Sequence, residues 1–104
     1  MYVIAVTSCA TGIAHTFMAA EAIKKAGKKY GAKVKVETQG AMGIENKLSD
    51  KDIASADLII FANDVKINKV ERFKGYEDKI INTTPHDVIG KKGLVEELIE
   101  NASK

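Results

Sequence analysis

The chain has 104 residues, of which 45% are hydrophobic, so it is long enough to bury one core and too short for two. Its 16 basic and 14 acidic side chains leave a formal net charge of only +2, spread along the sequence, which argues against nucleic acid as a partner. The first residues do not show the basic segment and apolar run of a secretory leader, and no apolar run approaches the roughly 20 residues that a bilayer-spanning helix needs. We therefore expect a soluble cytoplasmic protein with a single domain over residues 1–104 and no insertion into a membrane.

Metal binding and disulfide chemistry are also disfavoured. The sequence has one cysteine, Cys9, and two histidines, His15 and His86. A single cysteine cannot form an internal disulfide, and these residues do not have the spacing of metal ligands. The composition thus predicts no metal site.

Four short apolar runs alternate with segments of helical pattern, which is typical of βαβ units and a parallel sheet. The runs span residues 2–7, 33–38, 56–62 and 78–83. The first and third are almost wholly apolar, as expected of central strands, whereas the run 33–38 (KVKVET) alternates and is predicted to be an edge strand. By analogy with flavodoxin-like folds, we predict a small α/β sandwich of flavodoxin or Rossmann type, with a four-stranded parallel sheet in the order 2-1-3-4 and helices on both faces.

Capping residues mark the expected helix boundaries. They are a C-terminal cap at Tyr30-Gly31, a capping box of Ser49 and Asp52, and the start of a C-terminal helical region at Thr84-Pro85, which runs toward Ile99. His86 is then expected in the first turn of a helix rather than at a reaction centre.

Cys9 follows the first strand directly, at the carboxyl edge of the sheet where ligands of such folds collect. The small residues Ala10, Thr11, Gly12 and Ala14 come next, so consecutive backbone N–H groups can surround an anion before the helix begins. The same groups favour a thiolate, since cysteines in this setting can have pKa values of about 3.5 to 7.5. We interpret Cys9 as a nucleophile toward phosphorus; the alternative is a small buried hydrophobic residue.

The first helix has two faces when its residues are placed on a wheel. The polar face, interpreted as solvated, consists of Glu21, Lys24, Lys25 and Lys28. The face expected to pack on the sheet consists of Ala19, Ala22, Ile23, Ala26 and Tyr30. Ala14, Phe17 and Met18 fall on the polar side near the helix start, which suggests an apolar docking surface for a partner protein. The alternative is that residues 40–48 fold over these side chains and bury them.

The segment CATGIAHTFMAAEA (9–22) is similar to the signature Cys-Pro-Thr-Gly-Ile-Ala-His-Thr of the fructose-type enzyme IIB domains of the bacterial phosphoenolpyruvate-dependent sugar phosphotransferase system. The similarity continues through VETQG (36–40), GIEN (43–46) and the DI…ADLIIFAND region (52–64), and so covers most of the chain. In that family the cysteine accepts a phosphoryl group from a histidine of enzyme IIA and passes it to a sugar held by the membrane permease, enzyme IIC.

The resemblance implies a phosphotransferase in which Cys9 forms the phosphocysteine, with no cofactor beyond this covalent intermediate. It also implies that the phosphoryl oxygens are held by the segment Ala10, Thr11, Gly12, Ile13, Ala14, His15 and Thr16, through backbone N–H groups and the two threonine hydroxyls. The implied partners are an enzyme IIA phosphohistidine donor and an enzyme IIC permease with a fructose or fructose-like sugar.

One residue departs from the family pattern. Ala10 stands where the family has proline, which fixes φ near −65° and lacks an N–H, so alanine loosens the loop and offers one more donor. His15 stands six residues after Cys9, where cysteine-dependent tyrosine phosphatases place an arginine. A small phosphatase is therefore the alternative function, and a regulatory module that binds phosphate or partners without turnover is a third. His15 itself either contacts the phosphate or hydrogen-bonds to the backbone.

Other polar residues reach the same edge of the sheet. Asp64 is expected to cap the following helix rather than to rim the site. Gln39, Gly40 and Gly43 are expected to follow the second strand at this edge, where turn geometry explains the two glycines without any substrate.

Overall fold

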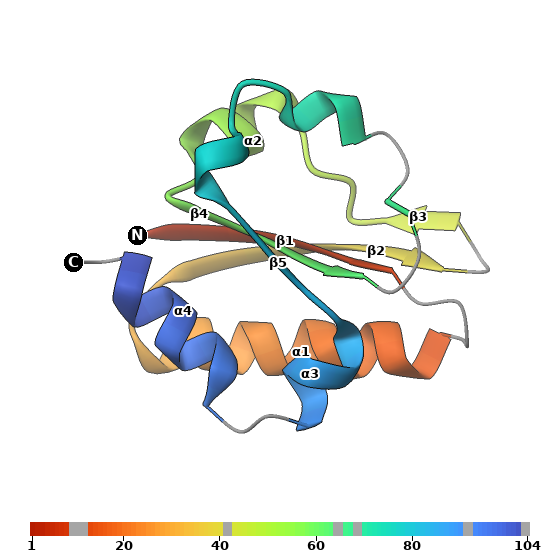
Figure 1. The fold of residues 1–104 in the computed structure, drawn as a ribbon, viewed down its shortest axis with the longest axis vertical. Coiled ribbons are helices and arrows are strands. Elements are labelled where there is room, and N and C mark those ends of the chain that lie inside the picture. The colour runs from red at the N-terminus through yellow and green to blue at the C-terminus, as the bar shows by residue number, and fades with distance from the viewer. Residues whose placement is uncertain (9–12, 41–42, 64–65, 68–69, 91–92, 103–104) are drawn as a thin grey trace.

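The computed structural model describes residues 1–8, 13–40, 43–63, 66–67, 70–90 and 93–102, which fold around a single mixed sheet. Its strands are β1 (Tyr2–Ser8), β2 (Lys33–Gly40), β3 (Gly43–Glu45), β4 (Leu58–Asn63) and β5 (Ile80–Thr83). The order across the sheet is β3-β2-β1-β4-β5, with β2, β1, β4 and β5 parallel (Figure 1). The predicted α/β class and the order of the four predicted strands are confirmed.

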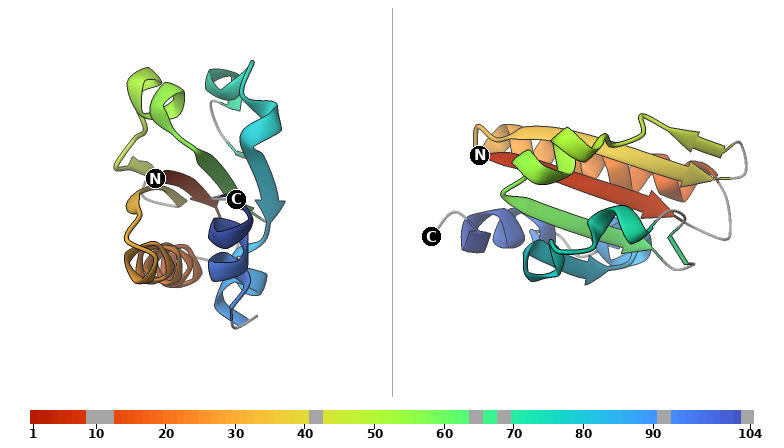
Figure 2. Two further views of the ribbon diagram at one scale, coloured as in Figure 1. Left: turned by 90° about the vertical axis from the view of Figure 1, so that its left-hand side faces the viewer. Right: turned by 90° about the horizontal axis from the view of Figure 1, so that it is seen from above.

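Helices cover both faces of this sheet (Figures 1 and 2). They are α1 (Ile13–Lys29), α2 (Asp50–Ser55), α3 (Pro85–Gly90) and α4 (Leu94–Ala102), with two short 3-10 helices, η1 (Val70–Phe73) and η2 (Glu77–Lys79). α1, α3 and α4 lie on one face, and α2 and η1 lie on the other. Among the described residues, no helix is both long and apolar enough to cross a membrane.

The sheet has one strand more than the sequence predicts. β3 pairs antiparallel with the end of β2, where Gly40 faces Gly43 and Thr38 faces Glu45. The prediction of β2 as an edge strand is therefore wrong at its carboxyl end, because β3 supplies the backbone partners that the alternating sequence did not reveal. Over its first residues, where no register with β3 exists, β2 remains the edge strand.

Two apolar clusters form the core, one on each face of the sheet. Val3 and Ala5 of β1 pack toward α1, where Ala19 and Ile23 are fully buried. Ile4 and Val6 point to the opposite cluster, which includes Ile53 of α2, Phe61 of β4 and Phe73 of η1. This alternation fixes which face each side chain of β1 and β2 occupies.

The buried and exposed faces predicted for α1 are confirmed except at the C-terminal end of the helix. Ala19, Ile23 and Ala26 are buried against the sheet, and the residues of the predicted polar face are exposed. Tyr30, expected on the buried face, is 45% exposed, because the helix ends at Lys29 and the chain turns away there.

The capping predictions also hold. Gly31 has a φ of +71°, and the Ala32 N–H donates to the carbonyl oxygen of Gly27 at 2.8 Å, which is the pattern of a glycine C-cap. Ser49 and Asp52 form the predicted capping box at the start of α2.

The C-terminal helical region is divided. Thr84 caps its start by accepting a hydrogen bond from the Asp87 N–H, and His86 lies exposed in the first turn, as expected. The region is not one helix to Ile99, however, because α3 ends at Gly90 and the chain passes through Gly93, with a φ of +86°, before α4 begins.

Candidate functional site

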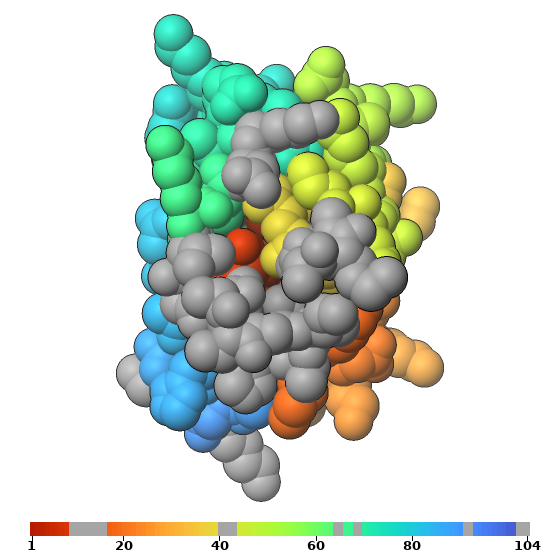
Figure 3. Space-filling view, turned by 90° about the vertical axis from the view of Figure 1, so that its right-hand side faces the viewer, coloured from red at the N-terminus to blue at the C-terminus, as the bar shows by residue number. Residues whose placement is uncertain are grey.

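The predicted site lies at the carboxyl edge of the sheet, where β1 ends at Ser8 and α1 begins at Ile13. Cys9, Ala10, Thr11 and Gly12 lie outside the described residues, as does Asp64. Ile13, Ala14, His15 and Thr16 form the first turn of α1. Figure 3 looks onto this edge, where atoms of β1 and β2 reach the surface near the centre of the view.

A polar row crosses three strands at this edge. Ser8 of β1 is in register with Gln39 of β2 on one side and with Asn63 of β4 on the other. Ser8 and Gln39 are each only 4% exposed. Gln39, expected to follow the second strand, is instead a buried residue within it, while Gly40 and Gly43 pair with each other across β2 and β3.

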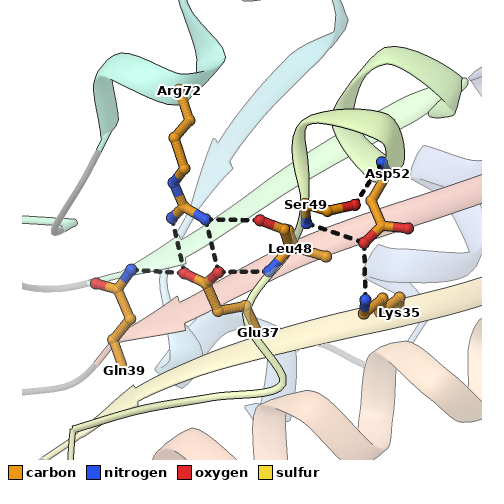
Figure 4. A network of polar contacts seen from close by, with 7 residues as sticks. All are labelled: Lys35, Glu37, Gln39, Leu48, Ser49, Asp52 and Arg72. Atoms are coloured by element: carbon orange, nitrogen blue, oxygen red, sulfur yellow. Dashed lines mark hydrogen bonds and ion pairs between the residues drawn. The ribbon is translucent and has the colours of Figure 1, made fainter.

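Behind this row lies an ion pair between the fully buried Glu37 of β2 and the partly buried Arg72 of η1 (Figure 4). The guanidinium is bidentate: Nη1 donates to Oε1 at 2.8 Å and Nη2 donates to Oε2 at 2.9 Å. The Leu48 N–H donates to Oε1 at 2.8 Å, and Gln39 Nε2 donates to Oε2 at 2.8 Å. Glu37 is 0% exposed, so its carboxylate is held entirely by protein donors.

The hydrogen bonds decide the charge state of this pair. Burial alone would raise the pKa of Glu37, but the donors on Arg72, Gln39 and Leu48 outweigh it and hold that pKa below its ordinary value. The hydrogen bonds to the carboxylate raise the pKa of Arg72 in turn. Both partners therefore stay charged at neutral pH.

Sequence reasoning missed this network. The alternating run 33–38 predicted only an edge strand, and Arg72 lies in a stretch without a predicted element, so nothing placed its guanidinium over the strand. The one available signal was Glu37 itself, a carboxylate between Val36 and Thr38 in a predicted strand.

A second ion pair lies on the same face of β2, farther from the edge. Lys35 Nζ lies 2.7 Å from Asp52 Oδ2 in the capping box, and this contact is the main reason that the pKa of Asp52 is held well below its ordinary value.

Thr7 lies on the opposite face, toward α1. It lies on the same face of β1 as Val3 and Ala5, which pack in the core cluster that contains Ala19 and Ile23 of α1. The residue is 0% exposed, and its Oγ1 has no hydrogen-bond partner among the described residues.

Phe17 and Met18 remain exposed, at 44% and 52%. The alternative in which residues 40–48 bury them is therefore wrong: residues 43–45 pair with β2 instead, and Leu48 enters the cluster on the other face of the sheet. Phe17 and Met18 line a shallow groove, named here the α1 groove, together with Glu21, Ala22, Lys25 and Ile89.

No group of three or more histidine, cysteine, aspartate or glutamate side chains in the described part of the chain is placed to hold a metal ion.

Comparison with known proteins agrees with this architecture. The family model described as "PTS system, Lactose/Cellobiose specific IIB subunit" matches residues 4–100. The "PTS system fructose-like EIIB component 2" of Escherichia coli K12 is 45% identical over 98 residues, covering 94% of this chain and 91% of that protein. A crystal structure of a predicted fructose-specific IIB from Escherichia coli, 34% identical, superposes with a TM-score of 0.87 over 97% of this chain and 88% of that one.

A third relative is much longer. The "PTS system fructose-specific EIIABC component" of Bacillus subtilis is 52% identical over 73 residues, which cover 70% of this chain and 11% of that protein.

The chain therefore belongs to the enzyme IIB components of the bacterial sugar phosphotransferase system. Within that system it is a fructose-type IIB component, a sugar phosphotransfer module.

Proposed function

We propose that this chain is a phosphoryl carrier in which Cys9 accepts the phosphoryl group of an enzyme IIA phosphohistidine and passes it to a fructose or fructose-like sugar held by an enzyme IIC permease. The observation that supports this most directly is the position of Cys9 in the chain. It stands between the carboxyl end of β1 and the start of the 17-residue helix α1, in a family of phosphotransfer components. A helix N-terminus in this position favours both a thiolate and bound phosphoryl oxygens.

The proposed relay has two steps. In the first, the N–P bond of the donor histidine breaks while the Cys9 thiolate forms an S–P bond. In the second, the S–P bond breaks while a sugar hydroxyl forms an O–P bond and loses its proton, which regenerates the thiolate. Such transfers depend mainly on positioning and on stabilisation of charge, which backbone donors of the segment 10–16 would supply.

The partners are proposed from the relatives. The Bacillus subtilis relative is named an EIIABC component, so its name joins a IIB part to IIA and IIC parts in one protein. We propose that the present chain works with separate or linked partners of the same kinds, in the cytoplasm and in transient association with the permease.

We further propose that the α1 groove docks enzyme IIA. Phe17 lies about one turn after the first residue of α1, so a protein that delivers a phosphoryl group to the preceding segment would pass over it. Exposed aromatic and methionine side chains are common in protein interfaces.

Labelling of Cys9 tests the carrier function. The chain would be incubated with phosphoenolpyruvate, the general phosphotransferase proteins and a fructose-type enzyme IIA, and its intact mass measured at neutral pH. We expect one added phosphoryl group on the wild type and none on Cys9→Ser.

A donor shown to be phosphorylated that leaves the wild type unlabelled would contradict the carrier function. In that case, hydrolysis of an aryl phosphate by the chain alone would support a phosphatase. Binding of enzyme IIA that persists in Cys9→Ser, without any labelling of the wild type, would support a regulatory module.

A further inference from the structure

The Glu37–Arg72 ion pair makes more hydrogen bonds than a contribution to stability alone would require. Glu37 accepts hydrogen bonds from Arg72, Gln39 and the Leu48 backbone, and it is fully buried. Replacing such a pair by apolar side chains of similar volume is often neutral or even stabilising, because desolvation of two charges offsets most of their attraction. A function other than net stability would therefore explain the network better.

The network joins segments that are far apart in the sequence. Arg72 Nη1 also donates to the Leu48 carbonyl oxygen at 3.1 Å, so one guanidinium connects η1, β2 and the residue that precedes the α2 cap (Figure 4). These contacts fix where β2 lies relative to η1 near the carboxyl edge.

Gln39 links the ion pair to the carboxyl edge of the sheet. Its Nε2 donates to Glu37, and Figure 4 shows its amide oxygen directed away from that carboxylate. Gln39 is in register with Ser8, the residue directly before Cys9. The ion pair thus sets the orientation of the buried Gln39 amide, which lies on β2 beside the end of β1.

We propose that Glu37, Arg72 and Gln39 are positioning residues for the Cys9 segment: the ion pair orients the Gln39 amide, and Gln39 holds the end of β1 from which Cys9 departs. The proposal rests on the proposed function of Cys9. Displacing a reacting group by about 1 Å can slow a reaction by about 100-fold. Residues that fix the position of the end of β1 therefore affect the rate of phosphoryl transfer through Cys9.

The test uses two variants and a matched control. Gln39→Met removes the amide and keeps a side chain of similar length. The double variant Glu37→Leu/Arg72→Met replaces the ion pair by apolar groups. Lys35→Met is the control, because it removes an ion pair from the same face of the same strand, two positions farther from the edge.

Three quantities are measured for each variant: the free energy of unfolding in urea, the rate of Cys9 phosphorylation by phosphorylated enzyme IIA, and the pH profile of Cys9 alkylation by iodoacetamide. We expect both test variants to remain folded, to accept phosphate at least about tenfold more slowly and to shift the alkylation profile to higher pH. Lys35→Met is expected to leave the rate and the profile unchanged.

Wild-type rates and profiles in either test variant, once folded, would overturn the proposal and assign the pair to folding alone. The alkylation profile needs no partner protein. If wild-type Cys9 is never phosphorylated, the proposed function fails, while the comparison of profiles still decides whether these residues position the thiol.

Discussion

The hydroxyl of Thr7 lies inside the protein without a partner among the described residues. An unsatisfied buried polar group destabilises a fold by about 1–3 kcal/mol, and valine has nearly the same shape as threonine. We therefore expect Thr7→Val to raise the free energy of unfolding of the unphosphorylated chain by about 1 kcal/mol, measured by urea denaturation at pH 7.

The control for this prediction is Thr7→Ser, which keeps the hydroxyl and removes the methyl group. It should lower the stability by about 1 kcal/mol, since a buried methyl group is lost. A Thr7→Val variant that is less stable than the wild type would contradict the prediction and mean that the hydroxyl has a partner in the folded chain.

At the residue scale, the sequence predicts what depends on local chemistry. Cys9 was identified because a thiol, small residues and a helix start follow one another along the chain. Glu37 was not identified, because its environment is created by Arg72, 35 positions away, and no local pattern reports such a contact. The docking and phosphate-binding roles of Phe17, Met18 and residues 10–16 stay predictions.

At the element scale, α1 approaches β2 closely at Gly27. A Cβ at this position would overlap Cγ2 of Val34, so a larger residue requires Val34 or the helix to shift. Helix propensity alone would make Gly27→Ala stabilising by about 1 kcal/mol. Overpacking of a tight contact destabilises by about 1–3 kcal/mol, so the steric effect should dominate and the variant should unfold at lower urea concentration.

Gly90 supplies the matched control for Gly27. It is the last residue of α3, and a Cβ there would meet nothing within 4 Å, so Gly90→Ala should be neutral or slightly stabilising. Adding Val34→Ala to Gly27→Ala should restore much of the lost stability, because it removes the overlapping methyl group. Additive losses in the double variant would contradict the steric explanation.

The elements themselves were predictable to different degrees. Hydrophobic periodicity predicts β1, β2, β4, β5 and α1. Ser49 and Asp52 predict the start of α2. β3 has only three residues, and its pairing with β2 is decided by backbone groups rather than by side-chain pattern. The break before α4 was missed, although Gly90 and Gly93 mark it in the sequence.

At the scale of the whole molecule, the carboxyl edge of the sheet and the start of α1 lie at the same end, which defines the side from which a donor protein would approach (Figure 1). Phe17 lies near this end and Tyr30 lies beyond the other end of the same helix. Their exposed fractions, 44% and 45%, are nearly equal. A comparison of substitutions at Phe17 and Tyr30 therefore separates the effect of position along the helix from the effect of exposed aromatic area.

We expect Phe17→Lys to weaken docking of phosphorylated enzyme IIA and Tyr30→Lys to leave it unchanged. A charge placed in the apolar α1 groove must lose water when a partner covers it, and truncation of an interface aromatic residue commonly costs more than 1 kcal/mol. The initial rate of Cys9 phosphorylation, measured against enzyme IIA concentration, should give about a tenfold higher KM for Phe17→Lys with a similar plateau. Because both side chains are exposed, either substitution should change the free energy of unfolding by about 0.5 kcal/mol at most. Equal KM values for the two folded variants would place the donor interface elsewhere on the surface and leave the labelling of Cys9 unaffected.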